Sequence, residues 1–379
     1  MNELINIKFI KLLKSINSCQ NSKEIHERII NFKHQYNIKS EDFKFHYNLA
    51  DILWKNLKLE EAIYYFKKCI TLDPDSENVK LSLKKAKKEK FDLITYLTFE
   101  NPNIKTTNQI IQCNQNLQKI HTNIALDQKI HNKTIINIYN KIQKIIIDHR
   151  LDTELEASQI HRETKIKYDC ERHFEIFDNF NVIPENCFEC YKIQIKPRSI
   201  IELFKLYLLF DKINLQKNLT RKCMIELRPN VKGAYKGYIY CIGLQEAEET
   251  IRLLNPILNR TISDKIPREI KRGCSEFALS YPNFKEIDHE NIKFMNYNLE
   301  WKEKENIIDR RILSRQKKSK IQISSLDGIT LKDALVINNW LYFAKEIGDE
   351  TYKDICSTPI QSDYISKKIT PELINNLQA

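Results

Sequence analysis

The distribution of glycine and proline limits which folds this 379-residue chain can form. All six glycines follow residue 232, and residues 103–183 contain neither glycine nor proline. A loop that cradles a phosphate needs glycine, because its backbone must approach the ligand closely. The first 232 residues therefore cannot hold a P-loop or a dinucleotide-binding fingerprint. Where both residues are absent, long uninterrupted helices are expected.

Composition describes a soluble globular protein of two or three domains, with 29% charged and 42% hydrophobic residues. The net charge of +11 suits an anionic partner, although a lysine excess in a chain also rich in Ile and Asn fits composition bias equally well. The first 16 residues indicate an amphipathic helix instead of an export signal, and no stretch is apolar enough to span a membrane. A reducing, cytoplasmic setting is expected, in which paired cysteines favour metal over disulfides.

Residues 43–74 have the pattern of a compact helical hairpin. Its small and apolar positions are Leu49, Ala50, Leu53, Ala62, Phe66 and Cys69, and Pro74 closes the unit. This pattern resembles a tetratricopeptide repeat (TPR), with His46 at a position that is usually aromatic or aliphatic and Leu57 in place of the usual glycine between the helices. Helices expected at 3–16, 22–36 and 78–97 would complete the stack, because a lone repeat cannot bury its face.

The TPR resemblance implies a groove that binds a peptide or a partner protein. The expected contacts are the polar residues Asn48, Asp51 and Lys55 of the first helix. The alternative is a small helical domain that only packs on the rest of the chain. Residues 106–165 are expected to form long helices, which would make a helical arm whose self-association is left open.

Two pairs of metal-ligating residues follow the arm. Two residues separate Cys170 from His173, and two residues separate Cys187 from Cys190. A predicted strand begins at Cys190. Four such ligands suit tetrahedral zinc with no open position, which predicts a structural rather than a catalytic ion. The alternatives are four ordinary core residues or a redox dithiol, and the latter is weak because this CxxC opens a strand instead of a helix.

Alternating residues and two helical segments within 190–279 predict the order β-α-β-β-α-β, that of a ferredoxin-like sandwich with one open sheet face. The residues predicted to face the helices are Ile193, Ile195, Cys223, Ile225, Leu227, Ile239 and Cys241. The residues predicted to face outward are Lys192, Gln194, Met224, Glu226, Arg228, Tyr238 and Tyr240.

The third predicted strand, KGYIYCIG (236–243), resembles the RNP1 element of RNA-recognition motifs. Lys236, Tyr238 and Tyr240 take its basic and stacking positions, while Ile239 and Gly243 depart from the pattern. The resemblance implies that RNA or single-stranded nucleic acid stacks on the open face, with Lys192, Arg228 and Lys236 meeting phosphates. The alternative is that these tyrosines pack against other parts of the chain.

An enzyme that acts on an anionic metabolite is a further alternative, without a nucleophile–base pair to support it. Its charged residues would be Arg221, Glu226, Arg228, Lys271, Arg272 and Glu276. Beyond the sandwich, residues 330–348 predict an amphipathic helix with Thr330 as N-cap, Gly348 at its end, and Trp340 on an apolar face that must dock.

The predicted architecture is therefore an α+β multidomain protein. Its expected parts are a TPR-like domain (1–100), a helical arm (101–167), a zinc-bearing ferredoxin-like domain (168–285), and a basic linker with a helical tail (286–379). The predicted function is that of a non-enzymatic interaction protein with a protein partner in the TPR-like groove. Binding of RNA or single-stranded nucleic acid is the alternative.

Overall fold

The computed structural model describes residues 22–36, 38–39, 42–55, 58–100, 109–122, 124–151, 155–162, 169–215, 219–314 and 328–378, with Leu12, Ser15 and Ile16. Of residues 22–23, 91–100, 312–314 and 376–378 only the backbone is described. The chain forms two compact units, Met1–Ile94 and Thr95–Ala379. Each unit is described by itself below.

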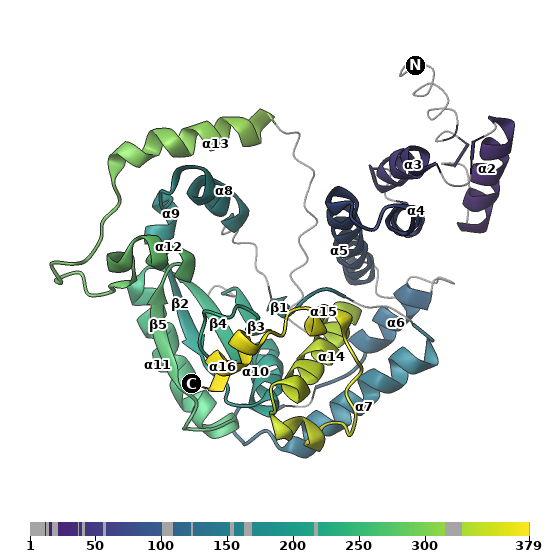
Figure 1. Ribbon diagram of the computed structural model, residues 1–379. Coiled ribbons are helices and arrows are strands. Elements are labelled where there is room, and N and C mark those ends of the chain that lie inside the picture. Colours follow the sequence, from purple (N-terminus) through teal and green to yellow (C-terminus); the bar gives the residue numbers. More distant parts are fainter. Residues whose placement is uncertain are drawn as a thin grey trace. The chain divides into compact units, whose positions relative to one another are not determined.

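The first unit is a stack of helices. Its described members are α2 (Ser22–Gln35), α3 (Phe43–Lys55), α4 (Leu59–Leu72) and α5 (Glu77–Glu100), of which α3 and α4 pack as a hairpin (Figure 1). Apolar residues recur at spacings of about three or four along each helix, so one side of each helix is buried in a shared core. The helix expected at 3–16 lies mostly outside the described residues, although Leu12 and Ile16 belong to this core.

The second unit is built on an antiparallel sheet of five strands in the order β1-β3-β4-β2-β5. The strands are β1 (Gln159–Arg162), β2 (Cys190–Ile195), β3 (Arg221–Ile225), β4 (Tyr235–Ile242) and β5 (Arg268–Arg272). With α10 (Ile200–Lys212) and α11 (Leu244–Thr261), the order along the chain from β2 to β5 is the predicted β-α-β-β-α-β order. The α+β layout is thus observed, with a helical amino-terminal region followed by this sheet.

One face of the sheet is covered by helices, as Figure 1 shows. Helix α10 packs on β3 and β4, and α11 packs on β2, β4 and β5. In β4, Gly237 lies on the same face as Ile239 and Cys241, which were predicted to face the helices. A side chain at Gly237 would meet Leu206 and Phe210 of α10, so this face of β4 does face a helix. Glycine at this position therefore lets helix and strand approach closely.

Residues 106–165 do not form helices throughout. They contain α6 (Gln109–Gln118) and α7 (Asn132–Asp148), but Gln159–Arg162 is the edge strand β1, which pairs with β3. Helix α7 packs on α10 within the second unit. The sequence did not predict this strand, because four residues are too few to show a two-residue periodicity. The segment is extended because it pairs with the edge of β3.

The predicted carboxy-terminal helix is confirmed as α14 (Leu331–Glu346). Thr330 and Asp333 form a capping box, and Gly348 follows the helix with a φ of 80°. Trp340 is fully buried, and α14 contacts β1, β3 and α10. The remaining elements are α8 (Cys170–Phe180), α9 (Glu185–Phe188), α12 (Ser275–Ser280), α13 (Lys302–Ser314), α15 (Asp363–Ser366), α16 (Pro371–Gln378), and the 3₁₀ helices η2 (Pro282–Lys285), η3 (Leu299–Trp301) and η4 (Glu350–Asp354).

Candidate functional site

The hairpin of α3 and α4 has a core that the sequence pattern anticipated. Its fully buried positions are Leu49, Ala50, Leu53, Ala62, Phe66 and Cys69. The departure at His46 is accommodated because its imidazole is buried as an aromatic ring, stacked on Tyr65 with 5.5 Å between ring centroids. The departure at Leu57 lies outside the described residues.

The predicted contact residues form a polar stripe on α3, made of Asn48, Asp51 and Lys55. Their spacing of i, i+3 and i+7 places them on one side of the helix. Asp51 Oδ2 and Lys55 Nζ form an ion pair at 2.6 Å, and the two side chains keep 32% and 62% of their surface exposed. The stripe can therefore offer hydrogen bonds and both signs of charge to a ligand.

Helix α5 is attached to both helices of the hairpin. Trp54, one turn after Asp51, donates a hydrogen bond from Nε1 to Oε2 of Glu89 at 2.6 Å. Lys90 Nζ lies 3.4 Å from Oε1 of Glu60 in α4. These bonds hold the polar stripe beside the next helix of the stack, which is how repeat stacks build a binding surface.

The predicted zinc ligands lie at one end of the sheet in the second unit. Cys170 is exposed at the start of α8, Cys187 is buried in α9, and Cys190 begins β2. His173 is buried, and its Nε2 has no hydrogen-bond partner in the described part of the chain. Among the described residues, no group of three or more His, Cys, Asp or Glu side chains is arranged to hold a metal ion. Zinc binding by this set stays a prediction.

The residues of the nucleic-acid hypothesis share one sheet face, but most of them are buried. Tyr238 keeps 6% of its surface, and its ring lies 6.3 Å from that of Tyr240. Lys236 is buried, and its Nζ lies 2.7 Å from Oε2 of Glu226. Arg228 also pairs with this carboxylate, with its Nε 2.8 Å from Oε1. The face is therefore not an open stacking platform, and nucleic-acid binding stays a prediction that requires these rings to become accessible.

Acid is expected to destabilise this sheet through Glu226. Burial raises the pKa of Glu226, but hydrogen bonds and ion pairs from Arg228 and Lys236 outweigh burial and hold the pKa at about 2, against an ordinary 4.5. Because the folded-state pKa is the lower one, the stabilisation is complete above about pH 4.5 and is lost as the pH falls towards 2. The difference between the two pKa values of Glu226 corresponds to about 3 kcal/mol of folding stability.

Urea unfolding of the full chain at several pH values measures this effect. The stability difference between the wild type and Glu226→Gln is expected to shrink between pH 5 and pH 2, because both then carry a neutral side chain. Glu350→Gln, at an exposed position in η4, is the control and should keep the wild-type pH dependence. A Glu226→Gln variant with an unchanged pH slope would contradict the assigned ion pairs.

The residues of the enzyme hypothesis do not converge on one site. Arg221 donates to the backbone of Phe210 and Leu219, and Arg272 donates to the carbonyl oxygens of Phe188 and Met295. Arg228 pairs with both Glu226 and Glu276, and Lys271 pairs with Glu269. These charges satisfy backbone and ionic partners of the fold, so they form no common anion site.

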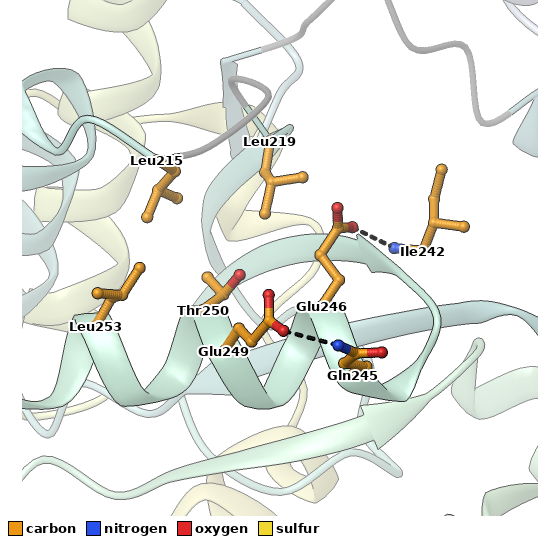
Figure 2. Close-up of a pocket in the computed structure, with 8 residues that line it drawn as sticks. All are labelled: Leu215, Leu219, Ile242, Gln245, Glu246, Glu249, Thr250 and Leu253. Atoms are coloured by element: carbon orange, nitrogen blue, oxygen red, sulfur yellow. Dashed lines mark hydrogen bonds between the residues drawn. The ribbon is translucent and has the colours of Figure 1, made fainter.

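A shallow pocket of about 310 Å³ lies over the first turns of α11 (Figure 2). It is lined by Leu215, Leu219, Ile242, Gln245, Glu246, Glu249, Thr250 and Leu253. Glu246 accepts a hydrogen bond from the backbone N–H of Ile242 at 2.7 Å, and Glu249 accepts one from Gln245 at 2.9 Å (Figure 2). The eight lining residues include no Cys, His, Lys or Arg, so this pocket offers no thiol, no imidazole base and no cationic side chain for an anion.

Comparison with known proteins supports one part of this geometry. Residues 43–76 match the family model for the tetratricopeptide repeat, so the hairpin of α3 and α4 is a TPR unit. No curated protein and no solved structure matches the chain. In the described residues, no helix is both long and apolar enough to cross a membrane. The family match thus makes the polar stripe of α3 the candidate functional site.

Proposed function

We propose that the protein binds a peptide segment of a partner protein through the polar stripe of α3 and is not an enzyme. The observation that carries this proposal is the TPR unit, matched by its family model and buried at its core positions. Stacks of this kind present a continuous surface for binding, and they contribute no catalytic groups of their own. The charged pair at the end of the stripe favours a ligand with polar or charged side chains.

A second observation supports the proposal: the polar stripe takes no part in the core of its own unit. Asn48, Asp51 and Lys55 are half-buried or exposed, whereas the apolar side of α3 supplies the core. Asp51 and Lys55 are bound to each other, so they are already held at a fixed spacing for a ligand. A pair of charges held in place loses less conformational entropy when it binds than two mobile side chains would.

Site-specific photo-crosslinking of the full chain tests where a partner binds. A photoreactive residue at Asn48 should crosslink to a peptide selected from a display library with the wild-type protein. The matched control is Lys67, an exposed position on α4, the other helix of the same hairpin. A peptide that crosslinks from position 67 and not from position 48 would place the binding surface elsewhere and overturn the proposal.

A further inference from the structure

A fourth cysteine lies beside the predicted zinc ligands. Strands β2 and β5 pair so that Tyr191 is opposite Arg272, and the N–H of Gly273 donates to the carbonyl oxygen of Cys190 at 2.7 Å. Cys274 follows at once as the N-cap of α12. Cys190 and Cys274 therefore lie at the same end of two adjacent strands.

Cys187 and Cys170 reach the same end of the sheet through aromatic contacts. Cys187 and Cys274 both pack in the cluster that contains Phe277. Phe174 and Phe177 of α8 contact Phe277 of α12, with ring centroids 5.6 and 4.8 Å apart. Because residues four apart share a helix side, the first residue of α8, Cys170, points the same way as Phe174.

Two lysines complete the charge balance of the cluster. The ammonium groups of Lys192 and Lys222 lie 5.3 and 5.1 Å from the ring centroid of Tyr238. Lys192 is buried and Lys222 is half-buried. An anionic centre near these two ammonium groups would offset the cost of removing them from water.

We propose that Cys170, Cys187, Cys190 and Cys274 bind one structural Zn²⁺, with Cys274 in the place assigned to His173 from the sequence. Zn²⁺ with four thiolates carries two negative charges, which Lys192 and Lys222 match. The thiols release their protons to solvent as they bind the ion. They are not arranged as a closed ligand group in the structure. Convergence on the ion therefore requires the thiols to adopt other side-chain rotamers.

Elemental analysis of the full chain, loaded with zinc and desalted, tests the ligand set. The wild type should retain about one zinc per chain, and Cys274→Ser and Cys190→Ser should each lower zinc affinity at least about tenfold. His173→Gln is the decisive comparison and should retain the metal, as should the remote Cys356→Ser. Loss of zinc in His173→Gln with retention in Cys274→Ser would overturn the four-cysteine site.

Cobalt substitution of the wild type avoids the problem that a cysteine variant fails to fold. Co²⁺ in a tetrahedral site of four thiolates gives intense sulfur-to-metal charge-transfer bands, whose intensity increases with the number of thiolates. The proposal requires the intensity of four thiolates and their displacement by Zn²⁺. An intensity that corresponds to three thiolates or fewer, or failure of the wild type to bind either ion, would contradict it.

Discussion

Replacement of Arg162 by methionine is expected to lower the free energy of unfolding of the second unit by about 3–5 kcal/mol. The Arg162 guanidinium is buried and donates to Asp211 at 2.6 Å, to Asp333 at 3.2 Å and to the Tyr207 hydroxyl at 2.9 Å. The Asp211 side chain is fully buried, so loss of the guanidinium would remove a close cationic partner from a buried carboxylate. Breaking a buried ion pair costs far more than breaking an exposed one.

Hydrogen exchange of peptides that cover β1 and β3, measured in increasing urea, reports this loss in the second unit alone. Arg198→Met is the matched control, because Arg198 also pairs with a carboxylate but keeps 48% of its side chain exposed. The control should cost less than about 1 kcal/mol. Asp211→Asn added to Arg162→Met should recover part of the loss, since it removes the buried charge that Arg162 no longer balances. Equal effects of Arg162→Met and Arg198→Met would show that the buried network does not stabilise the sheet.

Replacement of Trp340 by alanine is the second large expected effect, again about 3–5 kcal/mol. The indole is fully buried in α14, and its Nε1 donates to the carbonyl oxygen of Ser158 at 2.9 Å. Truncation removes the packing and leaves that carbonyl without this donor. The helix would then keep the hydrogen bonds from Asn339 to the carbonyl oxygens of Leu155 and Ala157, in the segment that leads into β1.

Urea unfolding of Trp340→Ala, read by hydrogen exchange of α14 peptides, measures this effect. Trp340→Phe keeps most of the volume and should cost much less. Leu279→Ala, at a position that is 83% exposed, should be close to neutral. A small effect of Trp340→Ala would mean that α14 is only loosely attached to the sheet.

The strands that the sequence predicted are those with several alternating residues. Two-residue periodicity located β2, β3 and β4 and assigned Ile239 and Cys241 to the face that the helices cover, which is the face on which Gly237 meets α10. Periodicity shows which residues share a face, but it cannot show what covers that face. Tyr238 was therefore assigned to the face opposite the helices without a decision between exposure and packing, and the structure buries it. The same limit explains β1, where the pairing edge of β3 supplies the information that four residues lack.

The candidate site could be predicted because a TPR unit is encoded locally. Its small and apolar positions lie within one short segment, so their spacing can be recognised without knowledge of the rest of the chain. Cys274 could not be found in this way, because only the pairing of β5 with β2 brings it beside Cys190. Local spacing instead pointed to His173, which follows Cys170 on the same helix.

The affinity of a selected peptide for a charge-swapped variant tests the proposed binding surface most directly. Asp51→Lys with Lys55→Glu keeps an ion pair within α3 while reversing the charges of the polar stripe. The control swap is Glu350→Lys with Lys353→Glu, an exposed pair in η4. Calorimetric titration of the full chain should show at least about tenfold weaker binding for the first swap and unchanged binding for the second. Equal affinity of the wild type and the Asp51/Lys55 swap would contradict recognition of a partner by the polar stripe.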